Sequence, residues 1–338
     1  MSRLKFSICI PVFKGSSVLS QALKTILTQS FTNFEVLIGD DNHPQDITEI
    51  NHTKELIASF KDIRIKYFKT PKNLGYAANL KFITSKAKND IIFLFAQDDL
   101  LSKNALQKTH DAFFLAKDIG AVTRAYFWYH KDVKKAVRAV SPLDKYQNKV
   151  INIFDSEQTF NHVMWSVGQL SGLAYRRDYL SMSFGDECFT AHIYPFLDIF
   201  KNHQVVFLKD YTVAVSIPTS QTRSISQIYD IPPTESWIKM YQRVLAEKKF
   251  QKLRKWGIKH MAKNYIGLVQ IKNYASQKYL LREIKLLIKY RWQNLFNLKF
   301  WFFSISCLII PQKALRPLVD LYKEKINSKL IPNIHFEY

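Results

Sequence analysis

The stretch KNDIIFLFAQDDLL, residues 88–101, decides the fold. Its run Ile91–Phe95 is continuously apolar rather than alternating, which is typical of a strand covered on both faces of a sheet. Asp98 and Asp99 follow at the expected carboxyl end, where open α/β sheets bind ligands. Paired carboxylates there suit a hard divalent cation that holds a phosphate. An aspartate before LLSKNALQK would equally serve as a helix N-cap, so both interpretations stay open.

Strand-like and helix-like segments alternate on either side of this stretch. We expect strands at residues 5–13, 34–39, 63–68, 120–129 and 205–216, and helices at residues 18–27, 47–60, 76–87, 102–117 and 156–167. Strand–helix–strand order favours parallel pairs with right-handed crossovers. The first hundred residues therefore predict the nucleotide-binding type of α/β sheet.

The whole chain has 338 residues, of which 47% are apolar, enough for one large domain or one domain with an appendage. Three cysteines, Cys9, Cys188 and Cys307, are too few for a disulfide framework and lack zinc spacing, so we expect a reducing compartment. The start of the chain, MSRLKFSICIPVF, has no long apolar core followed by a cleavage site. It predicts a strand rather than a signal peptide.

Charge is concentrated in the last third of the chain. The formal net charge is +21, and residues 237–338 hold 21 Lys and Arg against 5 Asp and Glu. Such asymmetry points to a polyanionic partner, either nucleic acid or an anionic membrane face. The segment FWFFSISCLII, residues 300–310, is shorter than the roughly 20 apolar residues that span a bilayer. Beside basic helices it predicts an in-plane membrane element, with packing on the rest of the protein as the alternative.

Three segments in order resemble the family 2 glycosyltransferases of the GT-A fold. They are SICIPVFKGSSVLSQALKTILTQSF (7–31) with FEVLIGDDN (34–42), NLGYAANLKFITSKAKNDIIFLFAQDD (73–99) and SGLAYRRDYL (171–180). The resemblance implies an α/β fold with a Rossmann-like mixed sheet flanked by helices. It implies a catalytic domain over residues 1–225 and a basic helical region over residues 226–338. The motifs look most like those of transferases that build bacterial cell-surface polysaccharide.

The resemblance also implies roles for the residues that match its motifs. Residues expected to contact the nucleotide-sugar are Pro11, Val12, Phe13, Asp40, Asp41, Asn73, Gly75 and Asp98. Asp40 and Asp41 fall where the family holds the base and ribose, a task that suits acids because they accept hydrogen bonds from N–H and hydroxyl groups. Asn73 and Gly75 belong to the segment that closes over the nucleotide.

Metal binding is expected at Asp98 and Asp99, with one departure from the family. The usual pattern is D-x-D-D, whereas this chain reads Ala96-Gln97-Asp98-Asp99. The first carboxylate is missing, so the cation, Mn²⁺ or Mg²⁺, would rest on two aspartates, the diphosphate and water. Such ions often use few protein ligands when phosphate is present.

A general base is expected just before the helix at residues 193–201. The family's acid pair falls on Ala191-His192, which makes His192 a candidate because imidazole titrates near neutrality. Asp186 and Glu187, a few residues earlier, are the rival candidates. Asp198, inside the helix, favours a structural role.

Further site residues are expected on loops. Arg223 lies in the polar loop after the last strand and could close over the diphosphate, or be an ordinary surface arginine. Trp165, Gly168 and Gly172 are expected on the acceptor side, since aromatic faces stack on sugars and glycines let a backbone approach a ligand. For Trp165 a place in the core is the alternative.

These observations predict an inverting glycosyltransferase that uses a nucleoside-diphosphate sugar as donor. The expected acceptor is a glycan or lipid-linked glycan, and the expected location is cytoplasmic and peripheral, on the inner face of the cell membrane. A nucleic-acid-binding protein is the first rival, but without an RNA or DNA recognition motif no nucleic acid is expected. A nucleotidyltransferase would need a glycine-rich basic phosphate loop, for which residues 14–17 are a poor match.

Overall fold

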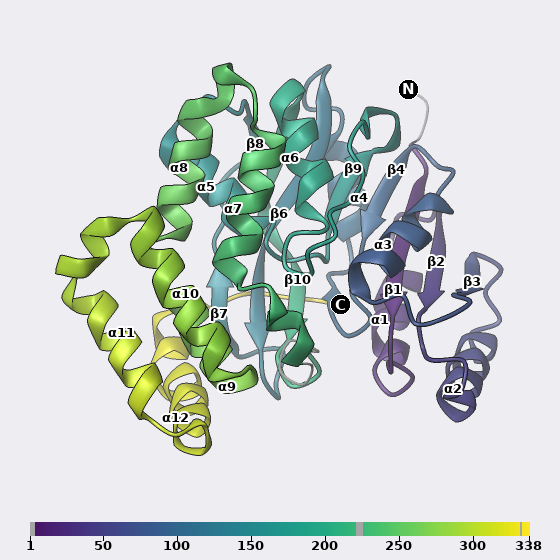
Figure 1. Ribbon diagram of the computed structural model, residues 1–338. Coiled ribbons are helices and arrows are strands. Elements are labelled where there is room, and N and C mark those ends of the chain that lie inside the picture. The colour runs from purple at the N-terminus through teal and green to yellow at the C-terminus, as the bar shows by residue number, and fades with distance from the viewer. Residues whose placement is uncertain (1–3, 221–225, 332) are drawn as a thin grey trace.

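The computed structural model describes residues 4–220, 226–331 and 333–338 (Figure 1). In this part of the chain ten strands form one sheet, with β3-β2-β1-β4-β9-β6-β10-β5 as its main order. β7 pairs with β6, and β8 pairs with β10. The strands are β1 (Phe6–Val12), β2 (Phe34–Asp40), β3 (Ile65–Lys69), β4 (Ile91–Leu94), β5 (Leu100–Leu101), β6 (Ile119–Tyr129), β7 (Ala136–Val140), β8 (Lys149–Ile151), β9 (Leu173–Arg176) and β10 (Gln204–Ser216).

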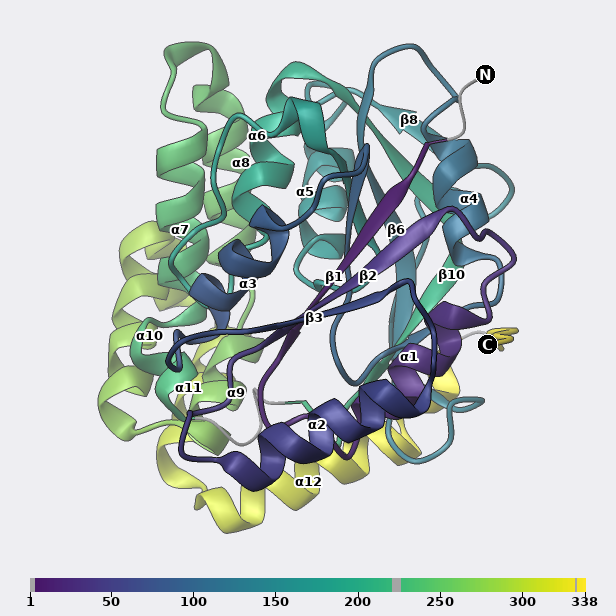
Figure 2. The same ribbon diagram turned by 90° about the vertical axis from the view of Figure 1, so that its right-hand side faces the viewer.

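Helices cover both faces of the sheet. In the edge-on view α3, α6 and α7 lie on one side, and α1 and α4 on the other (Figure 2). The helices are α1 (Leu19–Leu27), α2 (Ile47–Ser59), α3 (Tyr76–Ser85), α4 (Ala105–Ala112), α5 (Glu157–Ser166), α6 (Ile193–Asn202), α7 (Pro233–Val244), α8 (Gln251–Met261), α9 (Ile266–Tyr274), α10 (Gln277–Tyr290), α11 (Leu298–Ile309) and α12 (Gln312–Lys325). Short 3₁₀ turns occur at η1 (Arg177–Tyr179), η3 (Ser226–Asp230), η4 (Lys248–Phe250), η5 (Trp292–Phe296) and η6 (Asn327–Leu330).

The sheet changes from parallel to mixed beside β4. β1 pairs in parallel with both β2 and β4, and β2 pairs in parallel with β3. β9 then enters antiparallel between β4 and β6, and β6 runs parallel to β10. The carboxyl ends of β1, β2 and β4 therefore meet at one edge of the sheet, as the alternating segments predict.

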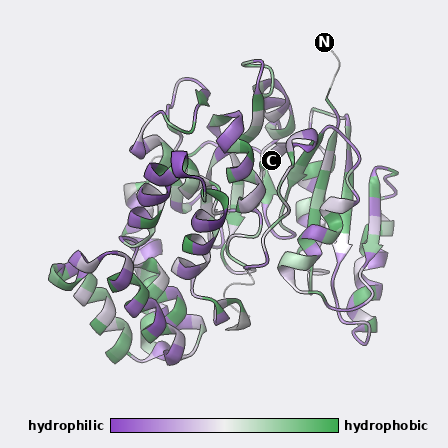
Figure 3. Cartoon of the chain, turned by 45° about the horizontal axis from the view of Figure 1, so that its top comes forward, coloured by the Kyte–Doolittle hydropathy of each residue, from purple (hydrophilic) through white to green (hydrophobic). Residues whose placement is uncertain are grey.

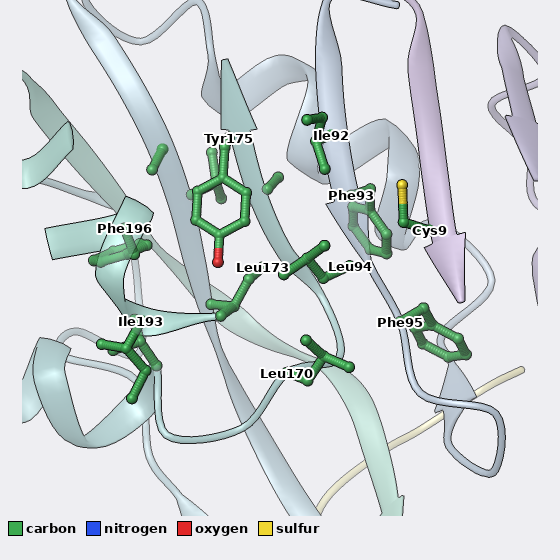
Figure 4. Close-up of a cluster of buried hydrophobic side chains, with 14 of the residues drawn as sticks. Cys9, Ile92, Phe93, Leu94, Phe95, Leu170, Leu173, Tyr175, Ile193 and Phe196 are labelled. Carbon is green, nitrogen blue, oxygen red and sulfur yellow. The ribbon is translucent and has the colours of Figure 1, made fainter. Parts of the chain in front are cut away.

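The apolar run of β4 is buried on both faces, as its sequence predicts. Ile91 and Leu94 have no exposed surface and Phe93 is 1% exposed. The neighbouring side chains of β1, β9 and the segment before β9 pack around them (Figure 4). Burying a side chain of this size contributes roughly 1.5–3 kcal/mol, so β4 is the centre of the core.

The two acids after β4 do not begin a helix. β4 ends at Leu94, Asp98 lies in a turn, and the short strand β5 follows. Helix α4 begins only at Ala105, with Asn104 at its N-cap, so the N-cap interpretation of Asp98 and Asp99 is wrong. The turn instead carries both aspartates to the edge where β1 and β2 end.

The C-terminal helices divide between two hydrophobic cores. Trp237 and Tyr241 of α7, Leu253 of α8 and Met261 pack in the same core as the strands. A second core holds side chains of α9 to α12 together with Tyr229. The domain boundary expected after residue 225 stays a prediction, and the packing ties α7 and α8 to the sheet.

Helix α11 carries the apolar segment predicted to meet a membrane or the protein. Phe300, Ser304 and Cys307 face the second core, whereas other side chains of the helix point outward. The C-terminal helices accordingly mix hydrophobic and hydrophilic positions along their length (Figure 3). Across the described residues, every helix is too short or too polar to cross a bilayer.

Candidate active site

Two adjoining cavities open where β1, β2 and β4 end. The Asp41 cavity, of about 280 Å³, is lined by residues that include Pro11, Val12, Phe13, Asp41, Asn73 and Gly75. The Asp98 cavity, of about 200 Å³, is lined by residues that include Asp98, Asp99, Gly168, Gln169 and His192. Pro11, Tyr76, Cys188 and Ile228 line both, so the two cavities form one cleft. Most residues predicted to contact a nucleotide-sugar thus come together here.

Asp41 holds the turn formed by Asn73, Leu74 and Gly75. Its Oδ1 accepts a hydrogen bond from the Leu74 N–H at 2.7 Å, and its Oδ2 accepts one from the Gly75 N–H at 2.8 Å. The Asn73 amide donates to the backbone carbonyl of Asp41 at 2.6 Å. Gly75 has φ +81°, a left-handed conformation that favours glycine. The aspartate and the NLG turn, 32 residues apart in sequence, are therefore one structural unit.

Asp40 is fully buried and does not line either cavity. Its Oδ1 accepts a hydrogen bond from the Asn42 N–H at 2.8 Å, and its Oδ2 accepts one from the Tyr67 hydroxyl at 2.6 Å. These contacts tie the end of β2 to β3. Contact between Asp40 and a nucleotide stays a prediction, whereas both of its carboxylate oxygens are hydrogen-bonded within the chain.

Asp99 is 1% exposed and takes three hydrogen bonds from the chain. Its Oδ2 accepts from the Ser171 hydroxyl at 2.6 Å and from the Gln169 amide at 2.9 Å, and its Oδ1 accepts from the Ser216 N–H at 3.1 Å. Burial and the adjacent Asp98 raise the pKa of Asp99. Asp99 therefore fixes the loop at residues 168–172 against the end of β10.

Asp98 is the more accessible of the two acids. Among the described residues it accepts one side-chain hydrogen bond, from the Thr219 hydroxyl at 2.8 Å. Burial raises the pKa of Asp98, an effect that a bound cation would oppose. Asp98 lines the Asp98 cavity and an adjoining cavity of about 540 Å³ beside α1, so it stands between two open spaces.

Gln97 occupies the turn position between the missing acid and Asp98. Its amide accepts a hydrogen bond from the Phe13 N–H at 2.9 Å and donates one to the Phe13 carbonyl at 3.1 Å. A Cβ at Gly15 would lie 2.3 Å from the end of the Gln97 side chain, so a larger residue there would displace the Gln97 amide. Ala96 instead donates its N–H to the Ser171 hydroxyl. The loop after β1 is thus pinned to the turn after β4.

His192 is the one general-base candidate that lines the cleft within the described residues. Its Nε2 lies 3.0 Å from the Val167 carbonyl and therefore carries the proton, while Nδ1 lies 3.3 Å from the Tyr76 hydroxyl. Burial lowers the pKa of His192 to about 4. The imidazole is therefore neutral over the physiological range.

The other base candidates have different surroundings. Asp186 is largely exposed and forms an ion pair with Lys81. Glu187 hydrogen-bonds Tyr194 and lines neither part of the cleft. Asp198 pairs with Lys201 at 2.9 Å and accepts a hydrogen bond from Ser181. A catalytic role for Asp186 or Glu187 stays a prediction.

The residues expected on the acceptor side do not all face open space. Gly168 lines the Asp98 cavity and a further chamber, which Trp165 also lines. Gly172 has φ +85°, and a Cβ there would come within 2.8 Å of Val213 and 3.0 Å of Arg124, so it is required by packing. Arg223 lies outside the described residues, so its predicted contact with the diphosphate stays a prediction.

Three lining residues have no counterpart in the sequence predictions. Tyr76 follows the NLG turn and reaches His192, and Gln169 reaches Asp99 across the cleft. Cys188 lines both cavities, and burial raises its pKa to about 11. Gly168 and Gly172 mark the loop at residues 168–172 in the sequence, but no local pattern distinguishes Gln169 or Cys188 from structural residues.

The site offers a divalent cation fewer carboxylate ligands than the family's usual D-x-D-D motif. Across the described residues there is no group of three or more His, Cys, Asp or Glu side chains arranged to hold a metal. Asp98 offers oxygen toward open space, whereas Asp99 already accepts three hydrogen bonds. A cation with one or two carboxylates and phosphate oxygens matches this donor set.

A cleft at the carboxyl ends of parallel strands is the ligand-binding arrangement of nucleotide-binding α/β proteins. Residues 7–168 match the family model described as Glycosyl transferase family 2. The resemblance seen in the motifs is therefore confirmed over this part of the chain.

Curated relatives match over part of their length. An uncharacterized glycosyltransferase of Haemophilus influenzae is 35% identical over 103 residues, which are 30% of this chain and 39% of that protein. The GalNAc(5)-diNAcBac-PP-undecaprenol beta-1,3-glucosyltransferase of Campylobacter jejuni is 30% identical over 105 residues, 30% of this chain and 32% of that protein. The matched segment thus covers less than half of each relative.

Solved structures are similar over nearly the whole chain. TarS 1-349 of S. aureus has a TM-score of 0.59 at 12% identity, covering 96% of this chain and 89% of that one. It has also been solved in complex with UDP-GlcNAc. The mannosyltransferase PcManGT of Pyrobaculum calidifontis, in complex with GDP-Man and Mn²⁺, has a TM-score of 0.52 at 13% identity, covering 91% and 87%. These likenesses confirm the predicted GT-A fold.

Proposed function

We propose that the protein is an inverting glycosyltransferase of cell-surface glycan synthesis. It moves a sugar from a nucleoside-diphosphate sugar to a hydroxyl of a glycan acceptor, which is lipid-linked. The single observation that carries this proposal is the cleft that joins the Asp41 cavity to the Asp98 cavity. It offers a place for a nucleotide beside a place for a cation, a sugar and an attacking hydroxyl.

Support for the two substrates comes from the relatives. TarS 1-349 has been solved with UDP-GlcNAc and PcManGT with GDP-Man and Mn²⁺, and the Campylobacter jejuni relative is named for an undecaprenol-linked glycan. Nucleoside-diphosphate sugars therefore bind the fold elsewhere. A lipid-linked glycan is an acceptor used by a relative of this family.

Asp98 is proposed to hold a Mn²⁺ or Mg²⁺ ion, with Asp99 next to it. When bound, the cation would stabilise the negative charge of the leaving diphosphate. Asp41 and the NLG turn that it fixes would hold the nucleotide, with Pro11, Val12 and Phe13 on the opposite wall. Asp99 would keep the loop at residues 168–172 in place while Asp98 faces the donor.

His192 is proposed as the group that accepts, through Tyr76, the proton of the attacking hydroxyl. It lines the Asp98 cavity, and its neutral imidazole leaves Nδ1 with a lone pair that the Tyr76 hydroxyl meets at 3.3 Å. A pKa of about 4 gives a weak base, and because the Tyr76 hydroxyl meets Nδ1, the attacking hydroxyl would give its proton to Tyr76 while Tyr76 passes its own proton to His192. Attack from the face opposite the diphosphate inverts the anomeric configuration.

A donor panel tests the activity. The full chain would be mixed with UDP-, GDP- and dTDP-sugars and Mn²⁺, and release of the nucleoside diphosphate would be measured with and without membrane extract. We expect one donor to be used, with release that depends on acceptor and cation. Asp132, in an exposed turn, gives the control variant Asp132→Asn. Absence of release and of binding with every donor would contradict the proposal.

Attachment to the inner face of the membrane is proposed through α11. Its outward side chains are Leu298 (88% exposed), Phe302 (68%) and Ile309 (74%). The region from residue 237 also carries 21 Lys and Arg against 5 Asp and Glu. Apolar side chains beside basic ones suit an anionic lipid surface.

Vesicle binding tests the attachment. We expect Phe302→Ser together with Ile309→Ser to weaken binding to phosphatidylglycerol vesicles at least tenfold, because two large side chains no longer enter the lipid. Ile63, 96% exposed beside β3, supplies the control variant Ile63→Ser. Equal sedimentation of the double variant and the wild type with vesicles would exclude α11 as the attachment site.

A further inference from the structure

A chamber of about 250 Å³ adjoins the Asp98 cavity on the side away from the Asp41 cavity. Gly168, Gln169 and Phe189 line both spaces, so the chamber opens onto the cleft. Its other walls come from distant parts of the chain, including β6, β7, α5, α7, α9 and α10. Aromatic rings are prominent in its lining: Tyr126, Trp128, Trp165, Phe189 and Trp237. We call this space the Arg138 chamber.

Arg138 of β7 lines this chamber, and no carboxylate among the described residues pairs with its guanidinium. Its guanidinium carbon lies 4.2 Å from the ring centre of Trp128 and 5.5 Å from that of Trp165. Among the described residues none forms a hydrogen bond or ion pair with its side chain. The two indoles hold the guanidinium by cation–π contact and leave its N–H groups unused. Such a fork matches the oxygens of a phosphate or carboxylate.

Glu283 of α10 is a second polar group that the chain leaves incompletely satisfied. It has no exposed surface, its Oε1 accepts a hydrogen bond from the Thr234 hydroxyl at 2.5 Å, and its Oε2 has no partner among the described residues. Burial raises the pKa of Glu283 to about 7. The carboxyl therefore stays largely protonated up to neutrality and does not cancel the charge of Arg138. A protonated carboxyl of this kind suits a hydrogen bond with a hydroxyl group of a sugar.

The chamber continues outward into a groove of about 720 Å³ on the surface. Trp165 and Asn264 line both spaces. The groove is lined further by Lys259, His260 and Lys263. Shared lining residues therefore connect the Asp98 cavity through the Arg138 chamber to a basic groove.

We propose that the Arg138 chamber binds the acceptor glycan, and that Arg138 holds an anionic group of that glycan, a phosphodiester or a carboxylate. Aromatic faces stack on the sugar rings, and the basic groove takes the next anionic units of the chain. The assignment rests on the proposed transferase function, because it places the acceptor hydroxyl beside the donor in the Asp98 cavity. An acceptor without anions would leave the Arg138 fork unmatched.

Binding of three oligomers of equal length tests this assignment. The probes are a glycerol phosphate oligomer, an oligogalacturonate and an uncharged maltooligosaccharide, titrated into the full chain by calorimetry. We expect at least one anionic oligomer to bind at least tenfold more tightly than the uncharged one. The better of the two identifies phosphodiester or carboxylate as the source of the charge.

Substitutions at Arg138 test whether this residue causes the preference for anionic oligomers. Arg138→Gln should bring the anionic and uncharged oligomers to equal affinity, and Arg138→Lys should keep part of the difference, because it keeps a charge without the fork. Arg177, half exposed on η1 and paired with Asp178, supplies the control Arg177→Gln. Thermal unfolding of each variant checks that it is folded, and if Arg138→Gln does not fold, a reduced preference in folded Arg138→Lys makes the assignment and an unchanged one overturns it.

The outcomes separate this inference from the proposed function. Equal affinity of the wild type for all three oligomers, or an unchanged preference in folded Arg138→Gln, overturns the role of Arg138. UDP- and GDP-sugar binding is measured on the same samples. Its absence counts against the transferase proposal, whereas retained nucleotide-sugar binding without an anion preference counts against the Arg138 chamber alone.

Discussion

The Asp41 cavity and the Arg138 chamber lie at opposite ends of one cleft, and they differ in how far the chain itself satisfies their ionisable side chains. Around the Asp41 cavity the chain supplies its own donors, since Asp41 takes the N–H groups of the NLG turn and Asp40 takes the Tyr67 hydroxyl. In the Arg138 chamber, Arg138 and one oxygen of Glu283 lack partners among the described residues.

We call the Asp41 cavity the prebuilt end of the cleft, because its acids are hydrogen-bonded within the chain, whereas the Arg138 chamber has groups left for a ligand to bind. Buried polar groups are almost always hydrogen-bonded, and each one left unmade costs about 1–3 kcal/mol. At the Asp41 cavity, Asp40 and Asp41 are hydrogen-bonded before any ligand binds. In the Arg138 chamber this cost applies to the buried Oε2 of Glu283, which a ligand with a hydrogen-bonding group can satisfy.

The largest effect is expected at the boundary between the two ends, at Asp98. Asp98→Asn should lower turnover at least 100-fold, because the charge that holds the cation is lost, while the free energy of unfolding changes by less than about 1 kcal/mol. Turnover and chemical denaturation of the same samples are the measurements. Asp178, exposed on η1, gives the control Asp178→Asn. Full activity of Asp98→Asn would remove the cation site from the cleft.

Glu283 gives the next largest effect, and it depends on pH. Its folded pKa of about 7 lies above its ordinary value of 4.5, so the native state holds a proton that the unfolded chain releases between these values. Stability is therefore lost as pH rises from about 4.5 to 7. Glu283→Gln should become more stable relative to the wild type by about 3 kcal/mol between pH 4.5 and pH 8.

Denaturation at both pH values checks this prediction. Exposed Glu247, which pairs with Lys249, supplies the control Glu247→Gln, whose difference from the wild type should stay constant. A constant difference for Glu283→Gln as well would show that its carboxyl is charged in the native state. The contrast between the two ends of the cleft would then be weaker than the burial of Glu283 implies.

A substitution at Asp99 tests whether its hydrogen bonds stabilise the loop at residues 168–172. Asp99→Ala removes the acceptor of the Ser171 hydroxyl, the Gln169 amide and the Ser216 N–H, so the protein should lose about 2 kcal/mol of stability. Asp98→Ala, one residue away, should lose less, because it removes one hydrogen bond from a hydroxyl. Chemical denaturation of both variants is the measurement, and equal losses would contradict the separate roles.

Gln97 gives the smallest effect. Gln97→Ala breaks both hydrogen bonds to Phe13, so the loop after β1 should loosen at a cost of about 1 kcal/mol. We expect KM for the nucleotide-sugar to rise a few fold with kcat nearly unchanged. Gln107, which is partly exposed and donates a hydrogen bond to Asp111, supplies the control Gln107→Ala. An unchanged KM would mean that the Phe13 loop does not need this anchor.

The prebuilt end could be predicted from the sequence because its signals are local. A continuous apolar run followed by two acids marked β4 and the turn after it, and the GDD and NLG motifs marked Asp41 and its partner turn. Their spacing matches the order in which parallel strands end at one edge. The structure adds what each acid contacts, which separates the buried roles of Asp40 and Asp99 from the open position of Asp98.

The Arg138 chamber could not be predicted in this way. Arg138 lies on β7, in a segment outside the predicted strands and helices, and Glu283 is the one acid of the basic helix α10. The two are 145 positions apart and carry no spacing that links them. Only the packing of α7 and α9–α10 beside the sheet brings their side chains to one space. The aromatic ring of Trp165 indicates sugar binding in the sequence, but its contact with Arg138 is visible only in the structure.

The position of β9 beside β4 has a consequence for synthesis of the chain. β4 gains one neighbour early, in β1, but its other edge waits for β9, about 80 residues later. At ribosomal rates of 5–20 residues per second, that edge stays open for roughly 4–16 s. An open apolar strand edge is a template for pairing with another chain. The nascent protein is therefore most prone to aggregate while residues 95–172 are being made, and pairing of β9 closes that interval.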